Sequence, residues 1–246
     1  MWSFKHGSQK SVVKLVEAVP AGCAELLAKA QVEIALVPAI EYQRIPGLKV
    51  VPQVCIASKE SVRSVILVTK VDELKKIRSI ALDESSRTSA ALVKIIFREF
   101  LGFEPEWTSA APDLQQMLAR NDAALIIGDP AMTFPRQDLS ILDMASLWRK
   151  HTGLGFVFAL WMIGPDASSE SRAIDFVAAR DEGLARAEEI IDHYQPLLGL
   201  TRDELKTYLH ENISFSLDSE LRAGLNLFYT LAHKHNLIPA VKTLNL

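Results

Sequence analysis

Asp83-Glu84-Ser85-Ser86-Arg87-Thr88-Ser89 is the most informative stretch of this chain and marks a candidate site. An apolar run, 77–82, precedes it, and a strongly amphipathic run, 90–101, follows it. This order predicts a strand, a polar loop and a helix. At a helix N-terminus, free backbone N–H groups and the helix dipole favour an anion. The loop lacks the glycines of a nucleotide phosphate loop, so a carboxylate or simple phosphate is the expected ligand.

The same loop also suits an ordinary helix cap, because Ser, Thr and Asp are favoured there without any ligand. One capping residue would satisfy that alternative, whereas this loop has four hydroxyl side chains and an arginine. We therefore interpret the loop as an anion-binding element. Its candidate substrate-binding residues are Ser85, Ser86, Arg87, Thr88 and Ser89.

Strand-like and helix-like segments alternate along the first two thirds of the chain. The helix after the loop has an apolar line, Leu92, Ile96 and Phe100, and Gly102 predicts its end. Such alternation predicts an α/β fold with mostly parallel sheets. The β-rich runs are 12–19, 32–37, 50–56, 62–69, 77–82, 106–108, 123–127 and 156–163.

From residue 168 to 198 the pattern is wholly helical, with a break near Gly183. Thr201 and Glu204 predict a capping box for the next helix, and Asp218 can cap the last one. Capping residues and apolar lines account for this helical tail, so we expect it to be structural.

We expect two lobes: the chain leaves lobe 1 near 61–65 and returns near 156–163, so two crossing strands lie over a cleft. Lobe 1 is then 1–63 with 162–246, and lobe 2 is 64–161.

Composition excludes several classes of protein. The 246 residues carry a net charge of -3, and the Lys and Arg residues are scattered, so no nucleic-acid partner is expected. No uninterrupted apolar segment approaches the roughly 20 residues that span a bilayer, so no membrane partner is expected. The first residues do not resemble a secretion signal, which favours a cytoplasmic location. Oligomeric state does not follow from the sequence.

Three further positions are candidates for the cleft. Gly128 and Asp129 follow a strand, and ligands of open α/β sheets bind outside the carboxyl ends of strands. A tight turn explains Gly-Asp-Pro equally well. Ser64 lies at the proposed crossing, where a plain strand edge is an equal alternative.

No motif predicts a metal site or a catalytic triad. The six histidines form no HExxH, and Cys23 and Cys55 fit no metal or redox spacing, so both are expected to be free thiols. No GxSxG elbow is present. Glu41 and Tyr42 follow a strand as acid/base candidates, although a helix start is their more ordinary role. We assign no catalytic residue, and we expect no metal.

Several segments, in order, resemble the chorismate dehydratases of futalosine-type menaquinone biosynthesis. The resemblance runs through nearly the whole chain. The segments that carry it are Cys23-Ala24-Glu25-Leu26-Leu27, Ile34-Ala35-Leu36-Val37-Pro38, Ile40-Glu41-Tyr42, Val62-Arg63-Ser64-Val65, Ser85 to Ser89, Leu125-Ile126-Ile127-Gly128-Asp129-Pro130-Ala131 and Gly155-Phe156-Val157-Phe158-Ala159-Leu160-Trp161.

The resemblance implies a type II periplasmic-binding-protein-like fold with a central cleft, working as a cytosolic enzyme without a cofactor. The implied reaction removes water from chorismate, a small dicarboxylate, to give 3-[(1-carboxyvinyl)oxy]benzoate. Ser85 to Ser89 would hold one carboxylate, Gly128 and Asp129 would line the opposite wall, and Ser64 is a weaker polar contact. No side chain is an obvious base, so a carboxylate of the substrate is a conceivable one.

The chain departs from the family pattern at two places. Members usually open with a first strand and a Ser-Tyr-Leu-Asn-type motif, and Met1 falls at about the point where that motif ends. Ala39 stands where many members have Ser. One alternative is a 1,4-dihydroxy-6-naphthoate synthase-like enzyme, which usually carries a catalytic His in lobe 2, where His151 is the only one. Another is a non-catalytic protein that binds a small aromatic acid.

Overall fold

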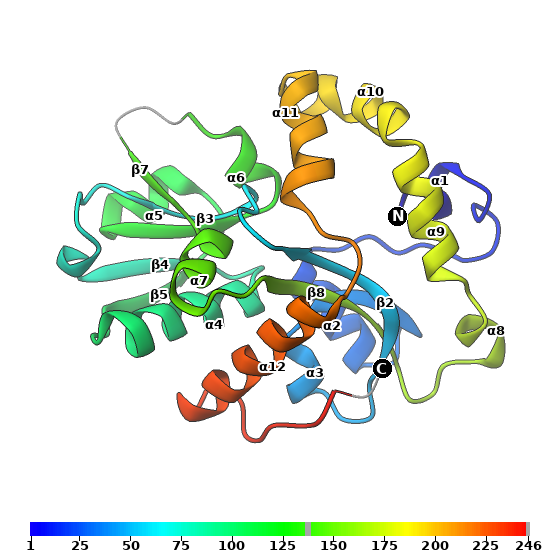
Figure 1. Ribbon diagram of the computed structural model, residues 1–246, viewed down its shortest axis with the longest axis horizontal. Helices are drawn as coiled ribbons and strands as arrows, with labels where there is room; N and C mark the ends of the chain where they lie inside the picture. Colours follow the sequence, from blue (N-terminus) through cyan, green and yellow to red (C-terminus); the bar gives the residue numbers. More distant parts are fainter. Residues whose placement is uncertain (136–138, 245–246) are drawn as a thin grey trace.

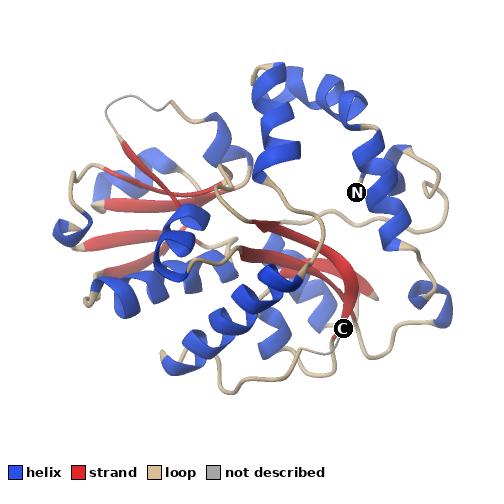
Figure 2. Ribbon diagram, in the orientation of Figure 1, coloured by secondary structure: helices blue, strands red, loops and turns tan. Residues whose placement is uncertain are grey.

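The computed structural model describes residues 1–135 and 139–244 and shows two β-sheets with helices around them (Figures 1 and 2). The smaller sheet has three strands in the order β1-β8-β2, and both of its pairings are antiparallel. Its strands are β1 (Ile34–Pro38), β8 (Phe156–Ile163) and β2 (Lys49–Ser58). This two-sheet arrangement confirms the predicted two-lobed α/β fold.

The larger sheet has five strands in the order β5-β4-β6-β3-β7. Strand β4 is parallel to β5 and β6, whereas β3 is antiparallel to β6 and β7. The prediction of mostly parallel sheets is therefore wrong, because helix-strand alternation does not reveal the direction in which each strand returns. The strands are β3 (Val65–Thr69), β4 (Ser79–Asp83), β5 (Glu106–Ala110), β6 (Ala123–Ile127) and β7 (Ser140–Asp143).

The chain passes between the two sheets twice, first between β2 and β3 and then between β7 and β8. Strand β8 lies wholly in the smaller sheet. We therefore propose that the return to lobe 1 falls before Phe156, some residues earlier than the boundary at 161 that the sequence suggested. The first crossing lies between Ser58 and Val65, and the lobe boundary at residue 63 stays a prediction.

Helices cover the sheets and form the last third of the chain (Figure 1). Their bounds are α1 (Trp2–His6), α2 (Pro20–Ala28), α3 (Glu41–Arg44), η1 (Leu74–Lys76), α4 (Arg87–Ile95), η2 (Ile96–Leu101), α5 (Leu114–Arg120), α6 (Asp129–Thr133), α7 (Met144–Thr152), α8 (Ser169–Arg172), α9 (Phe176–Ala185), α10 (Ala187–Leu198), α11 (Arg202–Thr207), η3 (Tyr208–Asn212) and α12 (Ser219–Lys234). Within the described residues, none of these helices is both long and apolar enough to span a bilayer.

Local sequence signals predict most helix ends correctly. Gly102 ends the α4–η2 helix in the left-handed conformation, with φ of 77°. The Thr201–Glu204 capping box and the Asp218 cap are both formed. The break in the tail falls at Arg186 rather than Gly183. The predicted strand at 12–19 is wrong: residues 14–19 lie outside any strand, and Val16 and Val19 are exposed.

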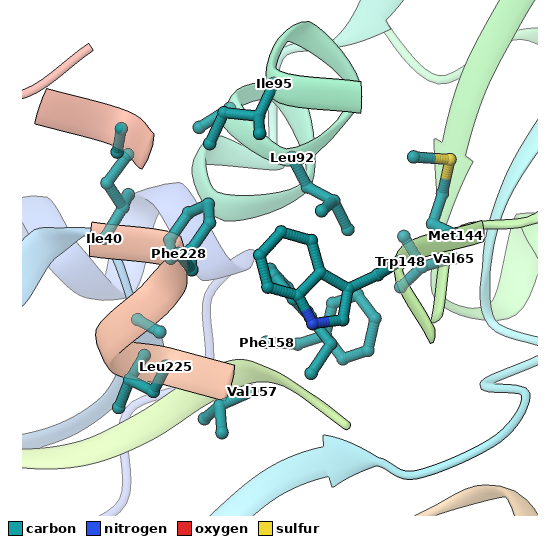
Figure 3. Packing of buried hydrophobic residues seen from close by; sticks show 14 of the residues in the cluster. Ile40, Val65, Leu92, Ile95, Met144, Trp148, Val157, Phe158, Leu225 and Phe228 are labelled. Atoms are coloured by element: carbon teal, nitrogen blue, oxygen red, sulfur yellow. The ribbon is translucent and has the colours of Figure 1, made fainter. Parts of the chain in front are cut away.

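One apolar core joins the two lobes, and its centre is the fully buried Trp148 of α7 (Figure 3). The Trp148 ring packs edge to face on Phe156 of β8 and on Phe228 of α12, with centroids 5.4 and 6.5 Å away. Its Nε1–H donates to the Gly155 carbonyl at 3.2 Å. We call this region the junction core.

The junction core brings α12 unusually close to the start of β8. A Cβ atom at Gly224 would lie 2.1 Å from the Gly155 carbonyl oxygen, so no larger residue fits without moving backbone. Leu92 of α4, from the lobe with the five-stranded sheet, joins the same cluster (Figure 3). The C-terminal helix therefore packs across both lobes and keeps them together.

Candidate functional site

A cavity of about 920 Å³ lies where the two lobes meet. Residues of the first crossing, the α4 loop and the end of β6 line one part of it: Ser64, Val65, Ser86, Thr88, Ser89, Ile127 and Gly128. Strands β1 and β8, the segment 12–18, helices α1 and α2 and the helical tail also contribute lining residues. We call this cavity the cleft. Its volume is within the range of small-molecule sites.

Parallel pairing places the two predicted polar loops side by side. Strands β4 and β6 run in the same direction as neighbours, so their carboxyl ends meet at one edge. The Asp83 carboxylate, at the end of β4, accepts hydrogen bonds from the Ser85 N–H at 2.9 Å and the Ser85 hydroxyl at 2.6 Å. It also lies 3.4 Å from the Ile127 N–H. Asp83 thus fixes the loop beside the end of β6.

The structure divides the predicted site residues into two groups. Ser64, Ser86, Thr88, Ser89 and Gly128 line the cleft. Ser85, Arg87 and Asp129 are not among its lining residues.

Arg87 is held by two carboxylates of lobe 1. Its guanidinium donates to Glu25 at 2.9 Å and to Glu41 at 3.2 Å. Glu41 is 2% exposed and also pairs with Arg44 at 3.0 Å. A buried carboxylate needs such partners, because an unpaired buried charge is very unfavourable. Arg87 therefore connects the α4 loop to lobe 1. The sequence could not indicate this, because its partners lie more than 40 positions away.

Two more residues of the loop bond to lobe 1. The Thr88 hydroxyl accepts from the Ile40 N–H at 3.1 Å, and the Ser85 carbonyl accepts from the Ala21 N–H at 3.2 Å. By contrast, no hydrogen bond within the described residues engages the hydroxyls of Ser86 and Ser89. Both hydroxyls, with the first-turn N–H groups of α4, are thus available to an anion in the cleft.

Ser64 and Gly128 line the cleft beside the α4 loop, not opposite it as the sequence suggested. The Gly128 N–H donates to the Ser64 carbonyl at 2.7 Å, so the two loops approach closely. Gly128 has φ of 68° and ψ of -146°, a conformation open essentially only to glycine. The Ser64 hydroxyl accepts from the Tyr208 hydroxyl at 3.0 Å. Asp129 follows as an exposed residue at the start of α6.

The helical tail contributes to the cleft, which sequence reasoning missed. Five of its residues line the cavity: Glu170, Ser171, Ile174, Phe176 and Tyr194. Phe158 and Trp161 of β8 line it too. The expectation of a purely structural tail is therefore wrong. Apolar and capping patterns describe how a helix is built, and they do not indicate which neighbour or cavity it faces.

His151 does not take part in the cleft. It lies in the last turn of α7 and stacks on Phe100, with ring centroids 4.7 Å apart and planes 1° from parallel. Burial, with a smaller contribution from Lys150, lowers the pKa of its imidazole. A stacked histidine outside the cavity does not support a catalytic His in lobe 2.

Together these features define a class of protein: two α/β lobes joined by two crossings, with a helix N-terminus lining the cleft between them. Solved structures share this fold. A protein of Archaeoglobus fulgidus has a TM-score of 0.74 at 20% identity, covering 96% of this chain and 94% of its own. The aliphatic sulphonate binding protein SsuA of Escherichia coli has a TM-score of 0.57 at 14% identity, covering 91% and 81%.

The sequence comparisons assign the chain to a family, which is a narrower class than the fold. A family described as menaquinone biosynthesis matches residues 1–234, so this chain belongs to that family. A chorismate dehydratase of Thermus thermophilus is 29% identical over 234 residues, covering 87% of this chain and 85% of the relative. The likeness therefore extends through both lobes and most of the tail.

Proposed function

We propose that this chain is a chorismate dehydratase, a hydro-lyase that converts chorismate to 3-[(1-carboxyvinyl)oxy]benzoate and water in menaquinone biosynthesis. Family membership and the Thermus thermophilus relative support this activity. The structural observation that supports it best is the N-terminus of α4, where two unengaged hydroxyls open into the cleft between the lobes.

In the reaction, the ring C–O bond to the hydroxyl breaks and a ring C–H proton is lost, so one water leaves and the ring becomes aromatic. The driving force lies in the product ring. The protein mainly has to hold two carboxylates, orient the ring and assist proton transfer. No redox or group-transfer step is required.

One carboxylate of the substrate binds the Ser86 and Ser89 hydroxyls and the first-turn N–H groups of α4. Charge-assisted hydrogen bonds of this kind are stronger than neutral ones. Ser64 and Gly128 line the cleft beside this loop. Among the described lining lysines, Lys14 is available to attract the anionic substrate, because Lys5 pairs with Glu17 at 2.7 Å. Arg87 and Thr88 hold the loop in place rather than contacting the substrate.

The proton acceptor is the substrate's own second carboxylate in this proposal. Glu17 and Glu33, two acids that line the cleft, are poor candidates for a general base. Hydrogen bonds from Ser171 and Ser168 hold the pKa of Glu33 below its usual value, and Glu17 is paired with Lys5. A carboxylate with a low pKa is a weak base.

The direct test is incubation of the purified protein with chorismate, with the product followed by chromatography and mass spectrometry. We expect 3-[(1-carboxyvinyl)oxy]benzoate to appear, and to appear far more slowly with the Ser86→Ala/Ser89→Ala double variant. Tight binding without conversion would overturn the enzyme assignment and would instead indicate a protein that binds small aromatic acids.

A further inference from the structure

Ser64 belongs to the first crossing between the lobes, residues 59–64, which we call the crossing segment. Asp143, the N-cap of α7, holds one side of it. The Asp143 carboxylate accepts from the Val62 N–H at 3.0 Å and from the Arg63 N–H at 2.7 Å. Arg63 has φ of 62°, a left-handed conformation that non-glycine residues rarely adopt. The backbone leading into Ser64 is therefore tightly constrained.

The other side of the crossing segment is held by the helical tail. Helices α9, α10 and α11 follow one another along one side of the molecule (Figure 1). The α11–η3 helix carries Glu204, Tyr208 and Asn212 at successive intervals of four residues, so all three lie on one face of it. We call these three residues the arm face.

Each residue of the arm face bonds to one residue of the crossing segment. Glu204 accepts from the Arg63 guanidinium at 2.7 Å. The Asn212 amide donates to the Ser61 hydroxyl at 3.1 Å. The Tyr208 hydroxyl bonds to the Ser64 hydroxyl at 3.0 Å. Of these three bonds, the one from Tyr208 is made to a side chain that lines the cleft.

The direction of the Tyr208–Ser64 hydrogen bond has a chemical consequence. A phenol is a better proton donor than an aliphatic alcohol, so Tyr208 donates and Ser64 accepts. The hydrogen of the Ser64 hydroxyl is then left free, in a side chain that lines the cleft. Burial, and the negative charge of the nearby Asp129, raise the pKa of Tyr208, so its phenol stays protonated and keeps donating.

We propose that Tyr208 is a positioning residue: by donating to Ser64, it orients the Ser64 hydroxyl so that this hydroxyl donates to the anionic substrate in the cleft. The inference rests on the proposed dehydratase function and names a specificity element within it. The helical tail thereby fixes the direction in which the Ser64 hydroxyl donates its hydrogen bond. Ser64 then prefers a ligand group that accepts a hydrogen bond, such as a carboxylate, over a group that donates one.

The test is a double-mutant cycle with Tyr208→Phe and Ser64→Ala, because Tyr208→Phe removes only the phenolic O–H. We expect Tyr208→Phe to weaken chorismate binding about 3- to 10-fold, the range that one oriented hydrogen bond supports. We expect KM to rise with kcat nearly unchanged, because the bond is made to the bound substrate throughout. In the Ser64→Ala background, Tyr208→Phe should have no further effect on Kd.

Asn212→Ala is the matched control, because Asn212 holds the same crossing segment without touching Ser64. Its effect on Kd should be the same in the wild-type and Ser64→Ala backgrounds. If Tyr208→Phe is also additive with Ser64→Ala, its role is only structural and the inference is overturned. Kd is measured by calorimetry with chorismate and with the product acid, separately from turnover. A wild-type chain that binds but does not convert chorismate would refute the proposed function alone, and the cycle would still decide the role of Tyr208.

Discussion

The junction core and the cleft both join the same two lobes, but they do so with different chemistry. In the junction core, Trp148, Phe156 and Phe228 pack without room for an added methyl group at Gly224. At the cleft, the lobes are joined by ion pairs and single hydrogen bonds around Arg87 and Thr88. Apolar packing therefore holds the lobes together, while the polar contacts set where the binding groups lie.

This difference indicates that neighbouring residues of one short segment have different roles. Within one loop, Ser86 and Ser89 face the cleft, whereas Arg87 and Thr88 bond to lobe 1. Substitutions in the junction core should mainly change stability. Substitutions at the cleft should change either stability or binding, depending on which way the side chain points.

The largest effect is expected for Gly224→Ala in the junction core. The new Cβ would overlap the Gly155 carbonyl, so α12 must shift, at an expected cost of about 2–3 kcal/mol in unfolding free energy. Gly183→Ala is the matched control, because it is also a helical glycine but its Cβ would meet nothing closer than Trp2 Cβ at 3.8 Å. That variant should be neutral or slightly stabilising. Equal losses of unfolding free energy for the two variants in urea denaturation would contradict the close packing of α12 against Gly155.

Arg87→Gln should come next, and it should act on stability. Removing the guanidinium leaves the buried Glu41 with Arg44 as its remaining ion-pair partner, at an expected cost of about 1–3 kcal/mol. Arg202→Gln, which breaks exposed ion pairs with Glu188 and Asp192, should leave the unfolding free energy nearly unchanged. A loss of chorismate affinity in Arg87→Gln without a change in Tm would instead assign Arg87 to the substrate.

Ser89→Ala should leave stability nearly unchanged and weaken substrate binding. Losing one hydroxyl–carboxylate bond of roughly 1.5 kcal/mol corresponds to about a tenfold rise in Kd. The comparison is with Ser109→Ala, the same change at an exposed position of β5. Calorimetric titration with chorismate measures both. An unchanged Kd for Ser89→Ala would remove this hydroxyl from the binding site.

The smallest expected effect concerns Glu204 and acid stability. Hydrogen bonds from the Thr201 backbone, then from Arg63, lower the pKa of Glu204 from 4.5 to about 2. Because the folded-state pKa is depressed, this contribution is fully present above about pH 4.5 and is lost as the pH falls through 2. Glu204→Gln should therefore lower Tm at pH 7 slightly and flatten its fall between pH 5 and 2.

The effect of Glu204→Gln should stay below about 1 kcal/mol, because the carboxylate is 39% exposed and screened by solvent. Glu211→Gln, an exposed carboxylate of the same helix, is the control. Identical pH profiles of Tm for the wild type and Glu204→Gln would show that the Arg63–Glu204 pair contributes nothing to acid stability.

Local patterns predicted the elements that local physics controls. The apolar line of α4, the left-handed Gly102 and the Thr201–Glu204 capping box depend on residues within a few positions of one another. The strand expected at 12–19 failed for the opposite reason. Its residues favour an extended conformation, but a strand also needs a neighbour to pair with, and the structure describes none for residues 14–19.

The sequence predicted where the candidate site lies, but not which contacts its residues make. The Ser85–Ser89 loop and Gly128 could each be placed at the end of a strand because both follow apolar runs, but only the structure shows that these two strands are neighbours. The partners of Arg87, and the contact between Tyr208 and Ser64, join residues 46 to 144 positions apart. No local pattern encodes such pairs, since nothing near Tyr208 in sequence indicates the crossing segment.

Sequence patterns alone established the alternation of strands and helices and the polar loop at the start of α4, because hydrophobic periodicity and helix capping are short-range properties. They also determined the family, through segments spread along the chain. The folded structure was needed to show which hydroxyls face the cleft and which hydroxyls join the lobes. It was also needed to show that the helical tail reaches the site. Those choices depend on long-range packing, which brings together groups whose partners lie far away in sequence.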